Sequence, residues 1–351
     1  MKWFRDIGPG VLIAAAFIGP GTVTLCTIAG ASFGYSLIWA IILSTFSTIV
    51  LQEMSLRIGL VTRMNLAEVI RTSIKSKILN RFIILLIISS ILIGNTAYEA
   101  GNITGASLGI SAIINYESIN YIPVFIGLIA FVILYQGDYK ILEKSLVSLV
   151  IVMSISFFIT AIMTKPDITS LLKGIFKPQV NSTNLIVVLG LIGTTVVPYN
   201  IFLHSSLVSE KWNSIEKLKV ARIESFISIL LGGLVSLSII ITAASVSNQN
   251  VTGVIDLAKG LEPLYGKFSI YFLGLGLFAS GITSSITAPL AAAYVAKSCF
   301  GWNNSLKSKG FRLVWIFILI TGVFVSMIKI NPIEIIKFAQ FSNSLLLPII
   351  A

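Results

Sequence analysis

Charged side chains are scarce in this sequence of 351 residues. Asp, Glu, Lys and Arg together make up 11% of it, whereas soluble globular domains carry about 25%. Hydrophobic residues make up 56%, and the mean hydropathy is +0.95. A soluble fold of ordinary composition is therefore excluded, and we interpret the chain as an integral membrane protein.

Side chains that bind metals or act as nucleophiles are also scarce. There are two cysteines and one histidine. No clustered Cys and His spacing, phosphate-binding glycine loop or nucleophile motif occurs, so the sequence supports no cofactor and no enzymatic reaction. Cys26 and Cys299 would lie near opposite faces of the membrane, and we expect both to be buried packing residues without a disulfide.

Apolar runs long enough to cross about 30 Å of hydrocarbon occur ten times. They cover residues 10–29, 35–59, 82–112, 121–136, 142–163, 184–208, 223–246, 268–298, 311–328 and 331–351. Most of the 25 Lys and Arg residues fall on the side of the N-terminus. Because basic short loops are retained in the cytoplasm, we expect a cytoplasmic N-terminus, in a bacterial inner (plasma) membrane. The net charge of +11 thus reports topology and indicates no nucleic-acid partner.

Glycine and proline interrupt two of these runs. The first interruption is Ile18-Gly19-Pro20-Gly21, and the second lies at Gly193 to Asn200, where Pro198 follows Val197. Proline removes a backbone donor and clashes with the preceding turn, so we expect both helices to break here. Two broken helices five spans apart are typical of transporters built from inverted repeats, whose substrates bind at the breaks.

Two ionisable residues stand out inside the spans. Glu99 is the carboxylate placed well inside span three, and burial of a charge there is costly. We expect a role in proton or ion movement, with a structural ion pair as the alternative. His204 in span six is either a satisfied packing residue or a titrating group beside the second break.

Five stretches of the chain occur in a recognisable order and spacing: Gly8-Pro9-Gly10, Gly30 to Trp39, Tyr139 to Lys144, Pro198 to Ser205 and Ser280 to Leu290. In these stretches the sequence resembles the NRAMP family of proton-coupled divalent-metal transporters. The resemblance implies an all-α membrane protein with the LeuT-type fold, in which two inverted five-helix repeats contain broken first and sixth helices. The whole chain, 1–351, would form one transmembrane domain, with repeat one over about 8–163 and repeat two over about 184–351.

The resemblance also implies a substrate site that has lost its usual ligands. Gly19 and Thr22 replace the family's metal-binding aspartate and asparagine, and Val197 replaces its methionine. The expected substrate-binding residues are Gly19, Thr22, Thr194, Val197, Tyr199, Asn200 and Gln340, and the identity of any bound metal is unknown. Neutral oxygens suit hard ions better than transition metals.

Four further residues lie at positions of the family's proton pathway. Glu99 falls at its span-three aspartate, Asn102 replaces the glutamate one turn later, and His204 matches the second of two histidines in span six. Arg312 matches the arginine that the family pairs with the span-three acid. We therefore expect a Glu99–Arg312 ion pair.

Three functions remain open from the sequence. The first is secondary transport of a cation by alternating access, with a relaxed site for a hydrated hard ion such as Mg²⁺ and with proton coupling left open. The second is a LeuT-like carrier of a small organic solute whose anionic group lies at the half-helix N-termini. The third is a non-transporting homologue. The expected partners are the transported ion or solute and the lipid bilayer, and we expect a monomer.

Overall fold

The structure is a computed structural model that describes residues 18–114, 121–136, 140–212, 214–246, 251–302, 308–328 and 330–351, with only the backbone for 140–146. All regular elements within these ranges are helices. The longer ones are α2 (Pro20–Phe33), α3 (Ile38–Thr62), α5 (Lys77–Ile114), α6 (Ile122–Gln136), α7 (Lys140–Met163), α9 (Leu185–Thr195), α10 (Pro198–Lys211), α11 (Leu218–Ala244), α14 (Ser269–Phe300), α15 (Lys309–Ser326) and α16 (Pro332–Ile350). The shorter ones are α4 (Leu66–Ser73), α8 (Ile168–Phe176), α12 (Val254–Lys259), α13 (Glu262–Tyr265), η2 (Ile215–Lys217) and η3 (Gly266–Phe268).

Most of the long helices are apolar enough to cross a membrane. Seven qualify among the described residues, or eight when the bent pair of α7 and α8 is included, and α6 is a shorter apolar helix. Their outward faces carry exposed side chains such as Phe46, Leu85 and Ile93. Such surfaces suit lipid, since lipid tails take the place of an apolar core.

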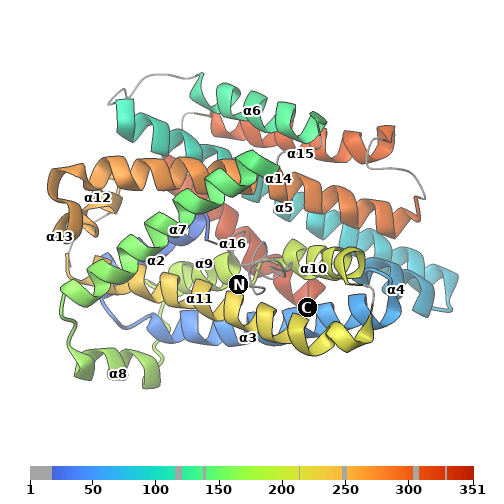
Figure 1. The fold of residues 1–351 in the computed structure, drawn as a ribbon, viewed down its shortest axis with the longest axis horizontal. Coiled ribbons are helices and arrows are strands. Elements are labelled where there is room, and N and C mark those ends of the chain that lie inside the picture. The colour runs from blue at the N-terminus through green and yellow to red at the C-terminus, as the bar shows by residue number, and fades with distance from the viewer. Residues whose placement is uncertain are drawn as a thin grey trace.

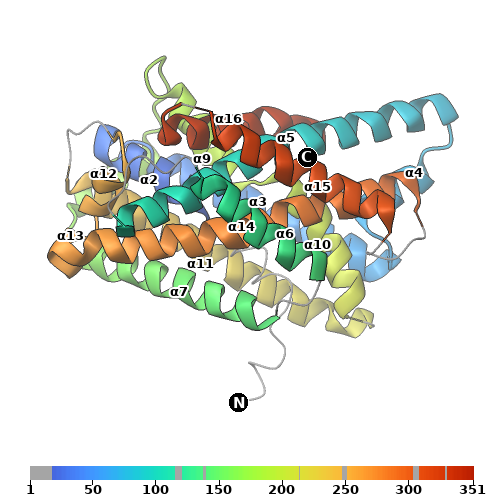
Figure 2. The same cartoon turned by 90° about the horizontal axis from the view of Figure 1, so that it is seen from above.

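The helices form one bundle around the two breaks. Helices α9, α10 and α16 lie in its middle, between α3 and α11 on one side and α5 and α14 on the other (Figure 1). The long helices α5 and α14 run side by side in both views (Figures 1 and 2). They approach closely because Gly281 of α14 faces Ala106 and the carbonyl of Asn102, where a Cβ would collide.

Both expected breaks are associated with a proline. Helix α2 begins at Pro20, after a bend at Ile18 and an extended Gly19. The half of span one expected over 10–17 lies outside the described residues. Helix α9 ends at Thr195 and α10 begins at Pro198, so Val196 and Val197 form a non-helical link. Proline at the first helical position needs no hydrogen-bond partner, which explains why both helices begin there.

The loops contain more structure than the sequence analysis predicts. The stretch 164–183, which lies between two of the expected spans, holds α8, which begins after an Asp167 side chain that accepts from the backbone N–H groups of Thr169 and Ser170. The connection between α3 and α5 holds α4, whose N-cap Asn65 accepts from the backbone N–H of Glu68. The first span extends past Ala29 to Phe33, and the turn follows at Gly34, whose φ of 58° suits glycine.

Candidate functional site

The two breaks meet through a pair of threonine hydroxyls. Thr22 lies in the first turn of α2 and Thr194 in the last turn of α9, and their Oγ1 atoms are 2.7 Å apart. Both side chains are buried. Thr48 of α3 donates to the backbone carbonyl of Thr195 at 3.2 Å. A carbonyl group in the last turn of α9, which has no partner within that helix, is therefore hydrogen-bonded. The expected neighbours from spans one and six are thus in direct contact.

Helix α16 closes the same junction through Gln340. The side-chain amide of Gln340 occupies the space that a Cβ on Gly21 would need, and its backbone carbonyl occupies the corresponding space at Gly193. Gln340 is buried, and its Oε1 has no hydrogen-bond partner among the described residues. The two glycines therefore let α16 pack tightly against both broken helices.

Two tyrosines form the wall beside the breaks. Tyr199, in the first turn of α10, packs edge to face against Tyr98 of α5, with ring centroids 5.6 Å apart. The hydroxyl of Tyr98 would lie 4.0 Å from a Cβ placed on Gly19, and the hydroxyl of Ser284 on α14 would lie 3.2 Å from it. Gly19 is therefore enclosed by α5 and α14. Val197 is also buried, as N-cap of α10.

Several buried polar atoms around the breaks have no hydrogen-bond partner within the described residues. They are Oγ1 of Thr24, Oγ of Ser284, Oδ1 of Asn200 and Oε1 of Gln340. Buried polar groups normally have partners, so unpaired ones at one junction indicate room for a ligand or water. All are neutral oxygens. No group of three or more His, Cys, Asp and Glu side chains that could hold a metal occurs in the described part of the chain.

Glu99 is fully buried on α5. Asn102, one turn later, donates to its Oε2 at 3.3 Å, while Oε1 has no hydrogen-bond partner in the described structure. Ser285 of α14 lies beside the carboxyl group. On the other side, Cγ of Glu99 would lie 2.5 Å from a Cβ placed on Gly322 of α15. The carboxyl group thus lies between α14 and α15, close to the wall that contains Tyr98 and Tyr199.

The expected Glu99–Arg312 ion pair is wrong. The guanidinium carbon of Arg312 lies 4.4 Å from the centre of the Tyr135 ring. Arg312 precedes Gly322, the α15 neighbour of Glu99, by ten positions, or about 15 Å of helix rise. The family resemblance identifies the correct pair of helices, but the two side chains sit at different heights along them.

His204 lies two turns into α10, on the side that faces α3. Its Nδ1 is 2.9 Å from Oε1 of Gln52, and its Nε2 has no partner in the described residues. Ser55 of α3 also donates to the carbonyl of Ile201 on α10. The expected proton-pathway residues are therefore divided among separate places: Glu99 with Asn102, His204 with Gln52, and Arg312 with Tyr135.

Sequence analysis did not single out four residues that complete this region. Tyr98, Ser284 and Ser285 border Gly19 and Glu99, and Gln52 contacts His204. Ser284 and Ser285 lie inside Ser280 to Leu290, one of the stretches that carry the family resemblance, and this position could have identified them. Nothing local in the sequence marks Gln52, because its contact depends on how α3 packs against α10.

These features define a membrane transporter with broken helices. The family profile described as "Natural resistance-associated macrophage protein-like" matches residues 10–351. The divalent metal cation transporter MntH of Caldanaerobacter subterraneus subsp. tengcongensis is 27% identical over 359 residues, covering 99% of this chain and 83% of the relative. The chain belongs to the Nramp family. Its relatives are transporters, so the expectation that it is no enzyme follows from the family.

Solved structures confirm the expected fold class. The Eremococcus coleocola manganese transporter, crystallised with an aromatic bis-isothiourea substituted compound, matches with a TM-score of 0.77 at 19% identity, over 98% of this chain and 76% of that one. Mhp1, a nucleobase-cation-symport-1 family transporter in a closed conformation, matches with a TM-score of 0.57 at 15% identity, over 94% and 74%. The fold is the LeuT type, with broken first and sixth helices.

Proposed function

We propose that the chain moves a hard cation such as Mg²⁺ across the membrane by alternating access. The observation that carries this proposal is the contact between the Thr22 and Thr194 hydroxyls at the junction of the two breaks. The side chains of Gln340, Tyr199 and Asn200 border the same junction and likewise supply neutral oxygens. Oxygen ligands suit Mg²⁺ and Ca²⁺, whereas thioether sulfur favours softer transition metals.

Among the described residues at the breaks no side chain is anionic, and this limits how the ion binds. A dehydrated divalent cation without a carboxylate would pay a large desolvation cost. Mg²⁺ gives up its water reluctantly and usually keeps several water ligands in protein sites. The substrate would therefore be a largely hydrated ion, which the unpaired hydroxyl and amide oxygens contact through its water.

Glu99 is the proposed proton carrier. Its burial, its hydrogen bond from Asn102 and its position beside Ser285 and the tyrosine wall support a carboxyl group that changes protonation during the cycle. His204, with one ring nitrogen bound to Gln52, is the proposed second group. Arg312 would act at its own end of α15, without a direct bond to Glu99.

Transport of a small organic solute is the second candidate. Helices α2 and α10 both begin at a break without a side-chain cap. The positive dipole ends of these helices would suit an anionic group. A thermal-shift screen of carboxylate-bearing solutes against Mg²⁺ and Ca²⁺ distinguishes the two candidates, because a ligand of the folded state raises its apparent stability.

Uptake by proteoliposomes tests the cation proposal. We expect Mg²⁺ uptake that equimolar Mn²⁺ does not abolish. The double variant Thr22→Val/Thr194→Val keeps the side-chain shape, removes both hydroxyls and should lower uptake severalfold. Thr321→Val is the matched control, because the hydroxyl of Thr321 only bonds carbonyls of its own helix, α15. Mn²⁺ uptake with which Mg²⁺ cannot compete would contradict the proposal.

We also propose a monomer in the bacterial inner membrane with a cytoplasmic N-terminus and the repeat boundaries given above. The distribution of Lys and Arg supports this orientation. The N-terminus itself lies outside the described residues. Labelling of single introduced cysteines with a membrane-impermeant reagent on intact cells tests the orientation, with Lys173→Cys expected to react and Lys219→Cys to be protected.

A further inference from the structure

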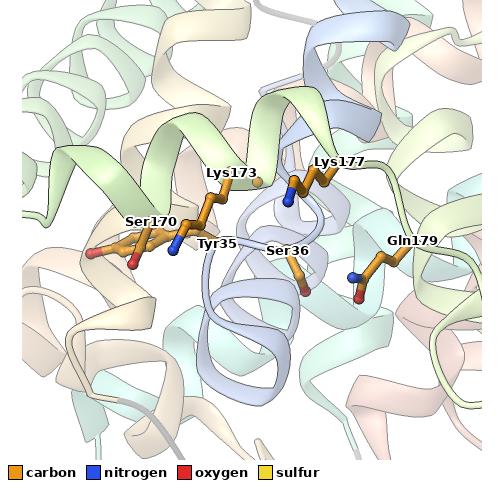
Figure 3. Close-up of a pocket in the computed structure, with 7 residues that line it drawn as sticks. Tyr35, Ser36, Ser170, Lys173, Lys177 and Gln179 are labelled. Atoms are coloured by element: carbon orange, nitrogen blue, oxygen red, sulfur yellow. The ribbon is translucent and has the colours of Figure 1, made fainter.

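A cleft lies between α8 and the turn that joins α2 to α3. It has a volume of about 280 Å³ and is lined by Tyr35, Ser36, Ser170, Lys173, Gly174, Lys177 and Gln179. Figure 3 shows the side chains of Lys173 and Lys177 extending from the α8 segment toward the turn that carries Tyr35 and Ser36. The cleft is remote from the two helix breaks, and the transport mechanism above does not use it.

The charge around this cleft is positive. Lys173 and Lys177 line it, and neither forms an ion pair within the described structure. Lys165 lies on the same connection, and among residues 164–183 the one acid is Asp167, which interacts with Lys173 and Tyr35. Three cations against one anion leave a net charge of +2. Ammonium groups and neutral donors such as the Gln179 amide fit a phosphate group.

The opposite side of α8 is apolar and exposed. Ile168, Leu172 and Phe176 follow each other at intervals of four residues and are 64%, 49% and 77% exposed. Residues four apart share one face of a helix. The axis of α8 turns by 117° from that of α7, so α8 does not continue across the bilayer. A short helix with one apolar and one basic face typically lies in the interface between lipid head groups and acyl chains.

Gly174 fixes how close α8 comes to the turn. A Cβ at this position would collide with the backbone carbonyl of Tyr35. The close contact holds Lys173 and Lys177, on either side of Gly174, over the turn. The cleft is therefore formed by backbone packing and does not depend only on mobile side chains.

We propose that this cleft binds the phosphodiester head group of an anionic phospholipid, while the lipid chains run along the apolar face of α8. The combination of a basic cleft with an adjacent exposed apolar face favours a lipid over free phosphate, which would use only the cleft. The predicted position of α8 at the membrane surface places lipid head groups at the same level. This site is independent of the cation proposed above and of the two breaks.

Native mass spectrometry of the detergent-solubilised full chain tests the proposal. The probes are phosphatidylglycerol, phosphatidylcholine and inorganic phosphate. We expect tighter retention of phosphatidylglycerol than of phosphatidylcholine. The variant Lys173→Gln/Lys177→Gln should weaken phosphatidylglycerol binding on the order of ten- to thirtyfold. This is the combined loss of affinity expected when two basic residues near an anionic lipid are removed. Lys173→Arg/Lys177→Arg keeps both charges and should retain the lipid.

The matched control removes two charges elsewhere. Lys267→Gln/Lys337→Gln changes two lysines outside the cleft and should bind phosphatidylglycerol like the parent. Equal weakening in this control would show a general charge effect and overturn the site. Unchanged lipid retention in Lys173→Gln/Lys177→Gln would also overturn it. Displacement of the lipid by millimolar inorganic phosphate would assign the cleft to free phosphate and reject the lipid proposal.

Discussion

The hydroxyls of Thr22 and Thr194 lie 2.7 Å apart, although the residues are 172 positions apart in the chain. One belongs to the helix that follows the first break and the other to the helix that precedes the second. A hydrogen bond between the two broken helices means that movement of either one changes the environment of the other. We therefore propose that the two breaks are parts of one site, in which a substrate that separates the hydroxyls would act on both proposed repeats.

The first prediction concerns metal selectivity. The variant Gly19→Asp/Thr22→Asn/Val197→Met restores the three ligand types that the family resemblance implies. It should gain Mn²⁺ affinity, because a carboxylate and a thioether add charge and softness to the site. Isothermal titration of both proteins with Mn²⁺ measures the gain. Space for a new side chain at Gly19 is limited by the Ser284 hydroxyl, 3.2 Å from the position of a Cβ, so a small shift of Ser284 must accompany it.

The control for this prediction is Gly19→Asn/Thr22→Asn/Val197→Met, which has a similar shape but no added charge. It should bind Mn²⁺ more weakly than the aspartate variant. Micromolar Mn²⁺ binding by the unmodified protein, with Mg²⁺ unable to compete, would show that other groups form the site.

The second prediction separates two glycines that contact Gln340. A Cβ at Gly193 meets the backbone of Gln340 and Ser344, whereas the three atoms nearest to a Cβ at Gly21 all belong to the flexible side chain of Gln340. Gly193→Ala should therefore lower stability by about 1–3 kcal/mol, the usual cost of overpacking. Gly21→Ala should lower stability less and should reduce transport, because Gln340 must rotate away from the junction. The measurements are the unfolding midpoint in detergent and substrate uptake.

Gly253→Ala is the control for both variants. Nothing lies within 4 Å of a Cβ built at Gly253, and its φ of −159° is extended. Both stability and uptake should stay unchanged. A larger loss of stability in Gly21→Ala than in Gly193→Ala would contradict the proposed packing of α16.

The positions of the breaks could be predicted from sequence because they follow from backbone chemistry. Pro20 and Pro198 each begin a helix. This position suits proline because an N–H group there would have no partner within the helix. Helix α8 was also within reach, since Asp167 precedes Thr169 and Ser170 as an N-cap. A capping residue between two apolar runs therefore indicates the start of a helix.

Side-chain partners across the bundle could not be predicted in the same way. The contact between His204 and Gln52 depends on which faces of α3 and α10 meet. The expected Glu99–Arg312 pair failed because a resemblance identifies neighbouring helices without giving the height of each residue along them. Glu99 lies instead against Gly322, and Arg312 against Tyr135.

The third prediction concerns the buried carboxyl group. Glu99→Gln keeps the size of the side chain and an oxygen that can accept from Asn102. The variant should fold and bind substrate but lose substrate-driven proton movement, because an amide does not carry a proton between states. A pH-sensitive dye inside proteoliposomes measures this movement. Arg312→Gln serves as the comparison, and its proton movement should persist since Arg312 does not contact Glu99. Equal loss in both variants would indicate that the two residues act as a pair.

The last prediction concerns the cap of α8. Asp167 accepts from the backbone N–H groups of Ser170 at 2.9 Å and Thr169 at 3.3 Å. Hydrogen bonds from Ser170, from both its side chain and its backbone, lower the pKa of Asp167, with smaller contributions from Thr169 and Lys173. The cap therefore stabilises α8 fully above the ordinary aspartate pKa of about 3.9. This stabilisation is lost as the pH falls through the lower pKa of the folded state. Asp167→Asn keeps a capping oxygen without a titrating group, so its α8 should not respond in this range. Hydrogen exchange over 168–176, compared between the two proteins at each pH, measures the difference, and a parallel response in both would exclude Asp167 as its cause.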